Sequence, residues 1–286
     1  MEVNNIDKIV NIDQWIKENE NNFCPPVCNA IMAEGFLKIM FIGGPNTRKD
    51  YHLEQGEELF YMIKGDMCLK IMLPEGPKDV LIKEGEIFLL PSCIPHSPQR
   101  FPNTIGLVVE RDRSNVCDVL RYYCDDGITI LWEKYFHLHS LVKDFPIIIK
   151  EFFESTEFKT GIPNKEAGKI QAFPSPKNLN FPEPIPLQEW LSKNFSAENN
   201  VVDLFNSEEF KVKIYRQGTF DIHNTNETWL WLKVGNGACT IDSKKNFLNQ
   251  NDSLLVSANK SFFLEVIGET SFCMVVTNVV PYKILT

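Results

Sequence analysis

Two histidines and a glutamate in the N-terminal half of the chain, His52, Glu58 and His96, have residue types and a spacing that suit a metal site. His52 and Glu58 share parity, so extended backbone would turn both side chains to one face, although a turn at Gly56 can break this register. His96 follows a strand that is expected to end at Pro91 and can return to the same place. Two imidazoles and one carboxylate with open positions beside them form the triad of non-haem iron(II) oxygenases. Zinc accepts the same ligands, so these residue types leave both metals open.

The residues around this triad follow a recognisable pattern. The chain reads Gly44-(x5)-Asp50-x-His52-(x5)-Glu58-(x6)-Gly65 and then Gly85-(x5)-Pro91-x-Cys93-x2-His96-x3-Arg100. This resembles the two cupin motifs, G-x5-H-x-H-x3,4-E-x6-G and G-x5-P-x-G-x2-H-x3-N. Asp50 replaces the first motif histidine, Arg100 replaces the asparagine, and the gap before Glu58 is longer. Fewer protein ligands leave more room for a chelating substrate and dioxygen, and Asp50 is expected to support the site rather than to ligate the metal.

The segments that must position these residues are short apolar runs separated by Gly, Pro and Asn, which predict strands. The expected strands cover residues 37–42, 58–63, 68–73, 80–82, 87–90 and 105–109. Gly65-Asp66 and Glu75-Gly76 are predicted hairpin turns. Residues 11–20 and 142–153 are predicted helices because their apolar residues recur at helical spacing. Many short strands with few helices indicate an antiparallel jelly-roll barrel.

The second half repeats this outline. Six prolines between residues 161 and 186 predict an extended linker. Further strands are expected at residues 212–215, 228–234, 238–241, 253–256, 262–266 and 272–277. The repeat predicts a mainly β chain with two cupin jelly-roll barrels and a few short helices. The expected boundaries are a metal-binding domain at 1–160, a linker at 161–181 and a degenerate domain at 182–286.

The second barrel is predicted to be metal-free and structural. Matching the glycines and apolar pairs of the two halves places Ile222, Thr228 and Ser261 opposite His52, Glu58 and His96. His223 falls one position out of register. The remaining pair, His137 and His139, is expected to have a surface or packing role.

Composition excludes several classes of protein. A formal charge of -9 argues against a nucleic-acid partner, and an anionic substrate would need locally placed arginines. Residues 1–20 have no apolar region typical of a signal peptide, and no stretch has the apolar length of a membrane span. The eight cysteines, including Cys24 and Cys28, contain no C-x-x-C pair. Reduced thiols are therefore expected, and with them a cytosolic location.

A closer resemblance rests on strings spread over the first half. They are FCPPVCN at 23–29, GGPNTRKDYH at 43–52, GDM at 65–67, GEIFLLP at 85–91, PHSPQR at 95–100, GLVVER at 106–111, RYY at 121–123 and EFF at 151–153. They resemble the 3-hydroxyanthranilate 3,4-dioxygenase family, densely over residues 10–160 and thinly beyond. Animal-type members are single-chain bicupins, whereas bacterial ones carry an additional Cys-rich iron site that this sequence lacks.

The resemblance implies roles for individual residues. His52, Glu58 and His96 would hold one Fe(II) per chain. Arg100 would pair with the substrate carboxylate, for which a planar guanidinium is suited. Glu110 would hydrogen-bond the polar ring substituents, with Glu58 also near the substrate.

Two further positions follow from the same resemblance. Arg48 would face dioxygen and stabilise developing negative charge. Asn29 is a weaker candidate for lining the pocket. Taken without the resemblance, an arginine and a glutamate such as Arg100 and Glu110 could equally form an ion pair at the rim.

The implied reaction is extradiol opening of 3-hydroxyanthranilate by dioxygen to 2-amino-3-carboxymuconate semialdehyde. This product is the precursor of quinolinate and NAD in the kynurenine pathway. A monomer is expected, because the second barrel can replace a partner subunit. Alternatives within the same fold are a thiol dioxygenase or a zinc-dependent sugar isomerase. A non-catalytic bicupin that stores or binds a ligand is the alternative outside enzymes.

Overall fold

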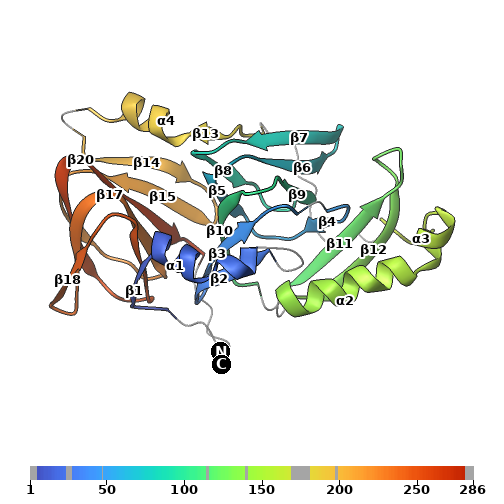
Figure 1. The fold of residues 1–286 in the computed structure, drawn as a ribbon, viewed down its shortest axis with the longest axis horizontal. Coiled ribbons are helices and arrows are strands. Elements are labelled where there is room, and N and C mark those ends of the chain that lie inside the picture. Colours follow the sequence, from blue (N-terminus) through green and yellow to red (C-terminus); the bar gives the residue numbers. More distant parts are fainter. Residues whose placement is uncertain are drawn as a thin grey trace.

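The computed structural model describes residues 5–23, 28–46, 48–113, 116–138, 141–168, 181–196 and 199–280. Two β domains lie side by side (Figure 1). From the far end of the first extend β11 (Cys117–Tyr123), β12 (Ile130–His137), α2 (Leu141–Glu154) and α3 (Thr156–Thr160). The chain is mainly β with a few short helices, as the sequence predicts. No helix of the described part is long and apolar enough to cross a membrane.

The first domain is built from two antiparallel sheets of six strands each. One sheet has the order β13-β8-β5-β10-β3-β2, and the other has the order β12-β11-β4-β9-β6-β7. The strands of the first sheet are β2 (Asn29–Glu34), β3 (Leu37–Gly43), β5 (Glu58–Lys64), β8 (Glu86–Leu90), β10 (Ile105–Arg111) and β13 (Ile185–Pro186). Those of the second are β4 (Tyr51–Leu53), β6 (Met67–Leu73), β7 (Gly76–Ile82), β9 (His96–Arg100), β11 (Cys117–Tyr123) and β12 (Ile130–His137).

Strand β5 shows how the sequence pattern sorts side chains between two cores. Phe60 and Met62 are buried in the cluster between the two sheets of the first domain. Leu59 and Tyr61 point the opposite way and pack in a cluster that also contains Trp231 of the second domain. Because strand side chains alternate, Glu58 shares the inward face with Phe60 and Met62. The apolar alternation therefore places the glutamate inside the barrel.

The second domain is one eight-stranded sheet that curls around its own core. Its strands are β1 (Ile9–Asn11), β14 (Val201–Asn206), β15 (Phe210–Tyr215), β16 (Gly218–Ile222), β17 (Thr228–Ile241), β18 (Lys244–Leu248), β19 (Asp252–Val256) and β20 (Phe262–Asn278). The expected strands at 228–234 and 238–241 are a single strand, and so are those at 262–266 and 272–277. Irregular pairing between β17 and β20 at Leu232, Val234 and Asn236 bends these strands without ending them. The prediction of four separate strands was wrong for this reason.

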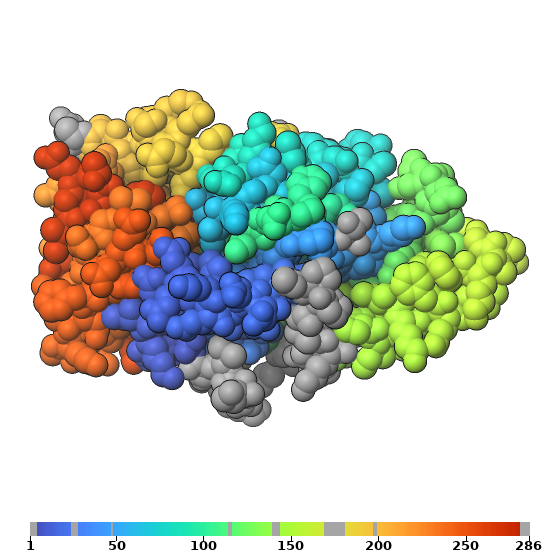
Figure 2. Space-filling model, viewed as in Figure 1, coloured from blue at the N-terminus to red at the C-terminus, as the bar shows by residue number. Residues whose placement is uncertain are grey.

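The two domains exchange short strands. β1, from the start of the chain, pairs with β19 of the second domain. β13 pairs with β8 of the first. In Figure 2 the N-terminal segment, in blue, lies across the boundary between the orange second domain and the first barrel. The expected domain boundaries stay a prediction, and residues 169–180 of the expected linker lie outside the described residues.

The helices include both that the sequence predicts. They are α1 (Ile12–Glu18), η1 (Glu20–Phe23, a 3-10 helix), α2 (Leu141–Glu154), α3 (Thr156–Thr160) and α4 (Leu187–Asn194). Asn11 caps α1 by accepting a hydrogen bond from the Gln14 backbone N–H. The hairpin predicted near Glu75-Gly76 is present between β6 and β7. The one predicted at Gly65-Asp66 was wrong, because β5 and β6 belong to different sheets and the turn carries the chain from one sheet to the other.

Candidate metal centre

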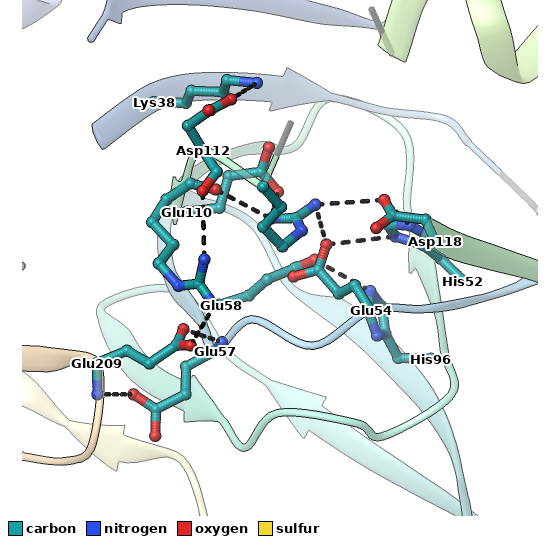
Figure 3. A network of polar contacts seen from close by, with 12 residues as sticks. Lys38, His52, Glu54, Glu57, Glu58, His96, Glu110, Asp112, Asp118 and Glu209 are labelled. Carbon is teal, nitrogen blue, oxygen red and sulfur yellow. Dashed lines mark hydrogen bonds and ion pairs between the residues drawn. The ribbon is translucent and has the colours of Figure 1, made fainter. Parts of the chain in front are cut away.

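His52, Glu58 and His96 converge inside the first barrel. His52 of β4 is the direct cross-strand partner of His96 of β9, and their ring centroids are 5.5 Å apart. Glu58 begins β5 in the facing sheet, and its Oε1 lies 3.3 Å from His96 Nε2. In Figure 3 the three side chains point toward one another. One ligand atom from each of the three lies within 4.8 Å of the others, and all three residues are buried. The structure thus brings together the three residues that the sequence singles out.

Neighbouring groups fix the two rings. His96 Nδ1 donates a hydrogen bond of 2.9 Å to the Ile94 carbonyl, which leaves Nε2 facing Glu58. His52 Nε2 donates to Asp118 Oδ2 at 2.9 Å, and the His52 ring packs edge-on against Phe145 of α2. Such partners hold imidazoles in one orientation, as in metal sites of other proteins.

The carboxylate of Glu58 and the imidazole of His96 stabilise each other's charged form. Burial raises the pKa of Glu58, but the nearby His96 and then His52 outweigh it and lower the pKa to about 2. Burial by itself would lower the pKa of His96. The attraction of Glu58 raises this pKa by more than burial lowers it, so the net shift is upward. A buried ionised carboxylate beside two imidazoles suits a divalent cation, which would replace the proton between them.

Two other groups of side chains, each of which shares one residue with the triad, also have the spacing of metal ligands. They are His52, Glu54 and Asp118, and Glu54, Glu58 and Glu110. Arg113 forms ion pairs with Glu54, with Glu110 at 3.3 Å and with Asp118 at 3.5 Å. One guanidinium already pairs with three of these carboxylates, so His52, Glu58 and His96 are the donor set that best fits a metal.

Arg100 lies on the same strand as His96 and, four residues on, shares its face. The side chain is buried, and its Nε and Nη2 atoms have no hydrogen-bond partner among the described residues. Nη1 donates a weak hydrogen bond of 3.7 Å to the sulfur of Met62. Burial lowers the pKa of Arg100 to about 10, which keeps it charged at neutral pH. A buried cation without an anion is costly, and this one has two donors free for a ligand.

Glu110, near the end of β10, also faces the interior, two residues beyond the buried Val108. Its partner is Arg113 and not Arg100, so the ion pair that the sequence left open between Arg100 and Glu110 does not form. Sequence reasoning missed Glu54, Arg113 and Asp118, which lie around Glu110 and His52. Glu54 could have been found because it lies two residues after His52, so that extended backbone turns both side chains to the same face. Arg113 could have been found because it lies three residues after Glu110.

Two candidates remain, Arg48 and Asn29. Arg48 is paired with Asp50, which bonds its Nε at 3.0 Å, and its guanidinium lies 5.2 Å from the centre of the Phe145 ring. Asp50 therefore supports Arg48, in agreement with its expected supporting role. Asn29 begins β2, opposite Ile42 of β3.

The other histidines lie outside this centre. His137 faces Cys117 across β11 and β12, with Nε2 3.4 Å from the sulfur. His223 is 74% exposed and contacts Asp221 and Ser261. His139 lies outside the described residues. All groups with metal-ligand spacing in the described part belong to the first barrel.

Two solved structures share this architecture. A cupin 2 conserved barrel domain protein from Leptotrichia buccalis superposes with a TM-score of 0.52 at 11% identity, covering 96% of this chain and 97% of that one. Oxalate decarboxylase from Bacillus subtilis gives a TM-score of 0.51 at 17% identity, covering 89% and 73%. These likenesses concern the fold alone. Fold and site together define a bicupin with a candidate metal centre in its first barrel.

Sequence comparison places the chain within this class. A family model described as 3-hydroxyanthranilic acid dioxygenase matches residues 4–153. The 3-hydroxyanthranilate 3,4-dioxygenase of Nematostella vectensis is 50% identical over 252 residues, covering 87% of this chain and 92% of the relative. The human enzyme of that name is 42% identical over 266 residues, covering 91% and 93%. The chain belongs to the 3-hydroxyanthranilate 3,4-dioxygenase family.

Proposed function

We propose that the protein is an iron(II)-dependent dioxygenase that opens the ring of 3-hydroxyanthranilate between the hydroxyl-bearing carbon and its unsubstituted neighbour. Both atoms of dioxygen enter the product, 2-amino-3-carboxymuconate semialdehyde, the precursor of quinolinate and NAD. The observation that carries the proposal is Arg100, a buried guanidinium with two unpartnered nitrogens on the same strand face as His96. An aromatic acid that can chelate a metal matches both the free donors of Arg100 and the candidate metal site beside them.

His52, Glu58 and His96 would hold the metal. When bound, a ferrous ion supplies adjacent positions for the aminophenol oxygen and nitrogen and for dioxygen, and the electronic path between them. Zinc has no redox chemistry, which is why iron and not zinc is proposed.

Residues of the barrel would orient the substrate. Arg100 would bind the carboxylate through Nε and Nη2, as a fork of two charge-assisted hydrogen bonds. Glu110, held by Arg113, would accept hydrogen bonds from the amine and hydroxyl, with Glu58 alongside. Fixing both ends of the ring in this way leaves a single orientation for the bond that breaks. Arg48, supported by Asp50, would stabilise negative charge that develops on dioxygen.

The proposal extends to the setting of the enzyme. The seven cysteines of the described part form no disulfides, which supports a reducing compartment such as the cytosol. The second barrel covers one face of the first through a large shared core, which supports a monomer. The second domain would be metal-free and structural. The domain limits 1–160 and 182–286 remain part of the proposal.

The test is oxygen uptake by the Fe(II)-loaded protein with three substrates. 3-Hydroxyanthranilate is expected to consume one dioxygen per molecule and to give the absorbance of the ring-opened product. 2-Aminophenol lacks the carboxylate and is expected to react with a much higher KM. Anthranilate lacks the hydroxyl and is expected not to react. Absence of iron-dependent uptake with 3-hydroxyanthranilate would contradict the proposal.

A further inference from the structure

Glu209 belongs to the second domain, between β14 and β15, yet its carboxylate is bonded to the first domain. Its Oε2 accepts a hydrogen bond of 2.8 Å from the backbone N–H of Glu57. Its Oε1 accepts one of 2.6 Å from Nη2 of Arg111. The side chain is only 11% exposed, so water competes little for these bonds. One carboxylate thus joins two separate segments of the metal-binding barrel.

The contact is reciprocal. Glu57 Oε2 accepts a hydrogen bond of 3.2 Å from the Glu209 backbone N–H and one of 2.5 Å from the Ser207 hydroxyl. Figure 3 shows Glu57 and Glu209 lying against each other on the opposite side of Glu58 from the metal ligands His52 and His96. Each glutamate therefore fixes the backbone of the other, and the turn before β5 is tied to the second domain.

The two segments held by Glu209 carry the functional carboxylates. Glu57 immediately precedes Glu58, the ligand that begins β5, and Arg111 immediately follows Glu110 on β10. These strands are hydrogen-bonded neighbours in which Val109 lies opposite Leu59. Carboxylate atoms of Glu58 and Glu110 consequently lie within 4.8 Å of each other. Such proximity of two acids needs a firm backbone to resist their repulsion.

We propose that Glu209 is a positioning residue, which sets the placement of Glu58 and Glu110 from the second domain. This inference rests on the roles given to those two residues in the proposed function. The second domain would then help to position the carboxylates of the metal centre, in addition to covering an apolar face of the first domain. Groups that orient ligands from behind typically change metal affinity or activity about 10- to 100-fold when removed.

Cobalt(II) binding tests the proposal, because cobalt absorption reports the arrangement of the ligands independently of turnover. Glu209→Ala is expected to weaken cobalt binding about 10-fold and to change the visible spectrum of the bound ion. Glu209→Gln keeps an acceptor for the Glu57 N–H but loses the charge that faces Arg111, so a smaller change of about 3-fold is expected. Glu208→Gln, at the adjacent exposed position, is the matched control and is expected to equal the wild type.

The outcomes separate the claims. A purely structural link would lower the unfolding temperature of Glu209→Gln while its spectrum and cobalt affinity stayed at wild-type values, and that result overturns the positioning role. Because Glu209→Gln is isosteric, it provides this test even if Glu209→Ala does not fold. Wild-type protein that binds cobalt but does not turn over 3-hydroxyanthranilate would contradict the proposed function alone. Wild-type protein that binds no cobalt would overturn both.

Discussion

His52 and His96 face each other directly across strands β4 and β9, with the acid of Glu58 reaching them from the opposite sheet. A cross-strand pair brings two side chains close without any loop having to fold correctly. The same arrangement makes register decisive, because a slip of one residue would turn one histidine to the other face. The candidate metal centre is therefore a property of strand pairing in the first barrel.

Replacement of Arg100 is expected to affect substrate binding and not metal binding. Arg100→Ala removes the two free donors, worth about 1.5–3 kcal/mol with a charged partner, so KM should rise about 10- to 100-fold. Steady-state kinetics and iron content measure the two effects. Arg100→Lys should restore little, because an ammonium lacks the two-point geometry. Arg216→Lys, in the second domain, is the control. An unchanged KM in Arg100→Ala would remove the carboxylate assignment.

Arg113 is expected to be essential for stability. Arg113→Met leaves the buried acids Glu54, Glu110 and Asp118 without their shared cation and should lower the free energy of unfolding by about 3–5 kcal/mol. Urea denaturation measures this change. Lys134→Met breaks an exposed pair with Glu151 and should cost less than about 1 kcal/mol. Equal, small losses in both variants would show that the buried cluster is not balanced by Arg113.

Lys233 makes stability depend on pH at the domain boundary. Its Nζ lies 4.3 Å from the centre of the Trp231 ring and 4.7 Å from that of Tyr61, and burial lowers its pKa to about 8. A lysine whose pKa is lower in the folded state opposes folding while it is charged, and this cost disappears as pH rises from about 8 towards the ordinary value near 10.4.

Lys233→Met is therefore expected to unfold at a higher temperature than the wild type at pH 7. The difference should narrow as pH rises from 7 to 10, because the wild-type lysine loses its charge without unfolding. Lys244→Met, at an exposed position, should show no such trend. A difference that is constant with pH would mean that Lys233 keeps its charge in the folded protein.

Local pattern was enough to predict the inward-facing part of the site. His52, Glu58 and His96 belong to motifs whose order and spacing predict that they meet, although β4 and β5 lie in different sheets. The role of Arg100 followed from the family resemblance and not from its local pattern. The predicted hairpin at Gly65-Asp66 was wrong because a glycine turn specifies a change of direction, whereas pairing partners depend on the whole sheet.

Contacts between distant segments could not be predicted. Asp118 reaches His52 across 66 residues, and Glu209 reaches Glu57 across 152. Neither acid has a local signature, since each is one of many charged residues between apolar ones. Their importance follows from burial, which only the folded arrangement of the two domains creates.

Iron content measured together with activity tests the central claim most directly. Wild-type protein reconstituted with Fe(II) and freed of excess metal should hold one iron per chain and oxidise 3-hydroxyanthranilate. His52→Ala, Glu58→Ala and His96→Ala should each lose iron and activity together, while remaining folded by circular dichroism. Full activity in any of these variants without bound metal would contradict a metal centre formed by these three residues.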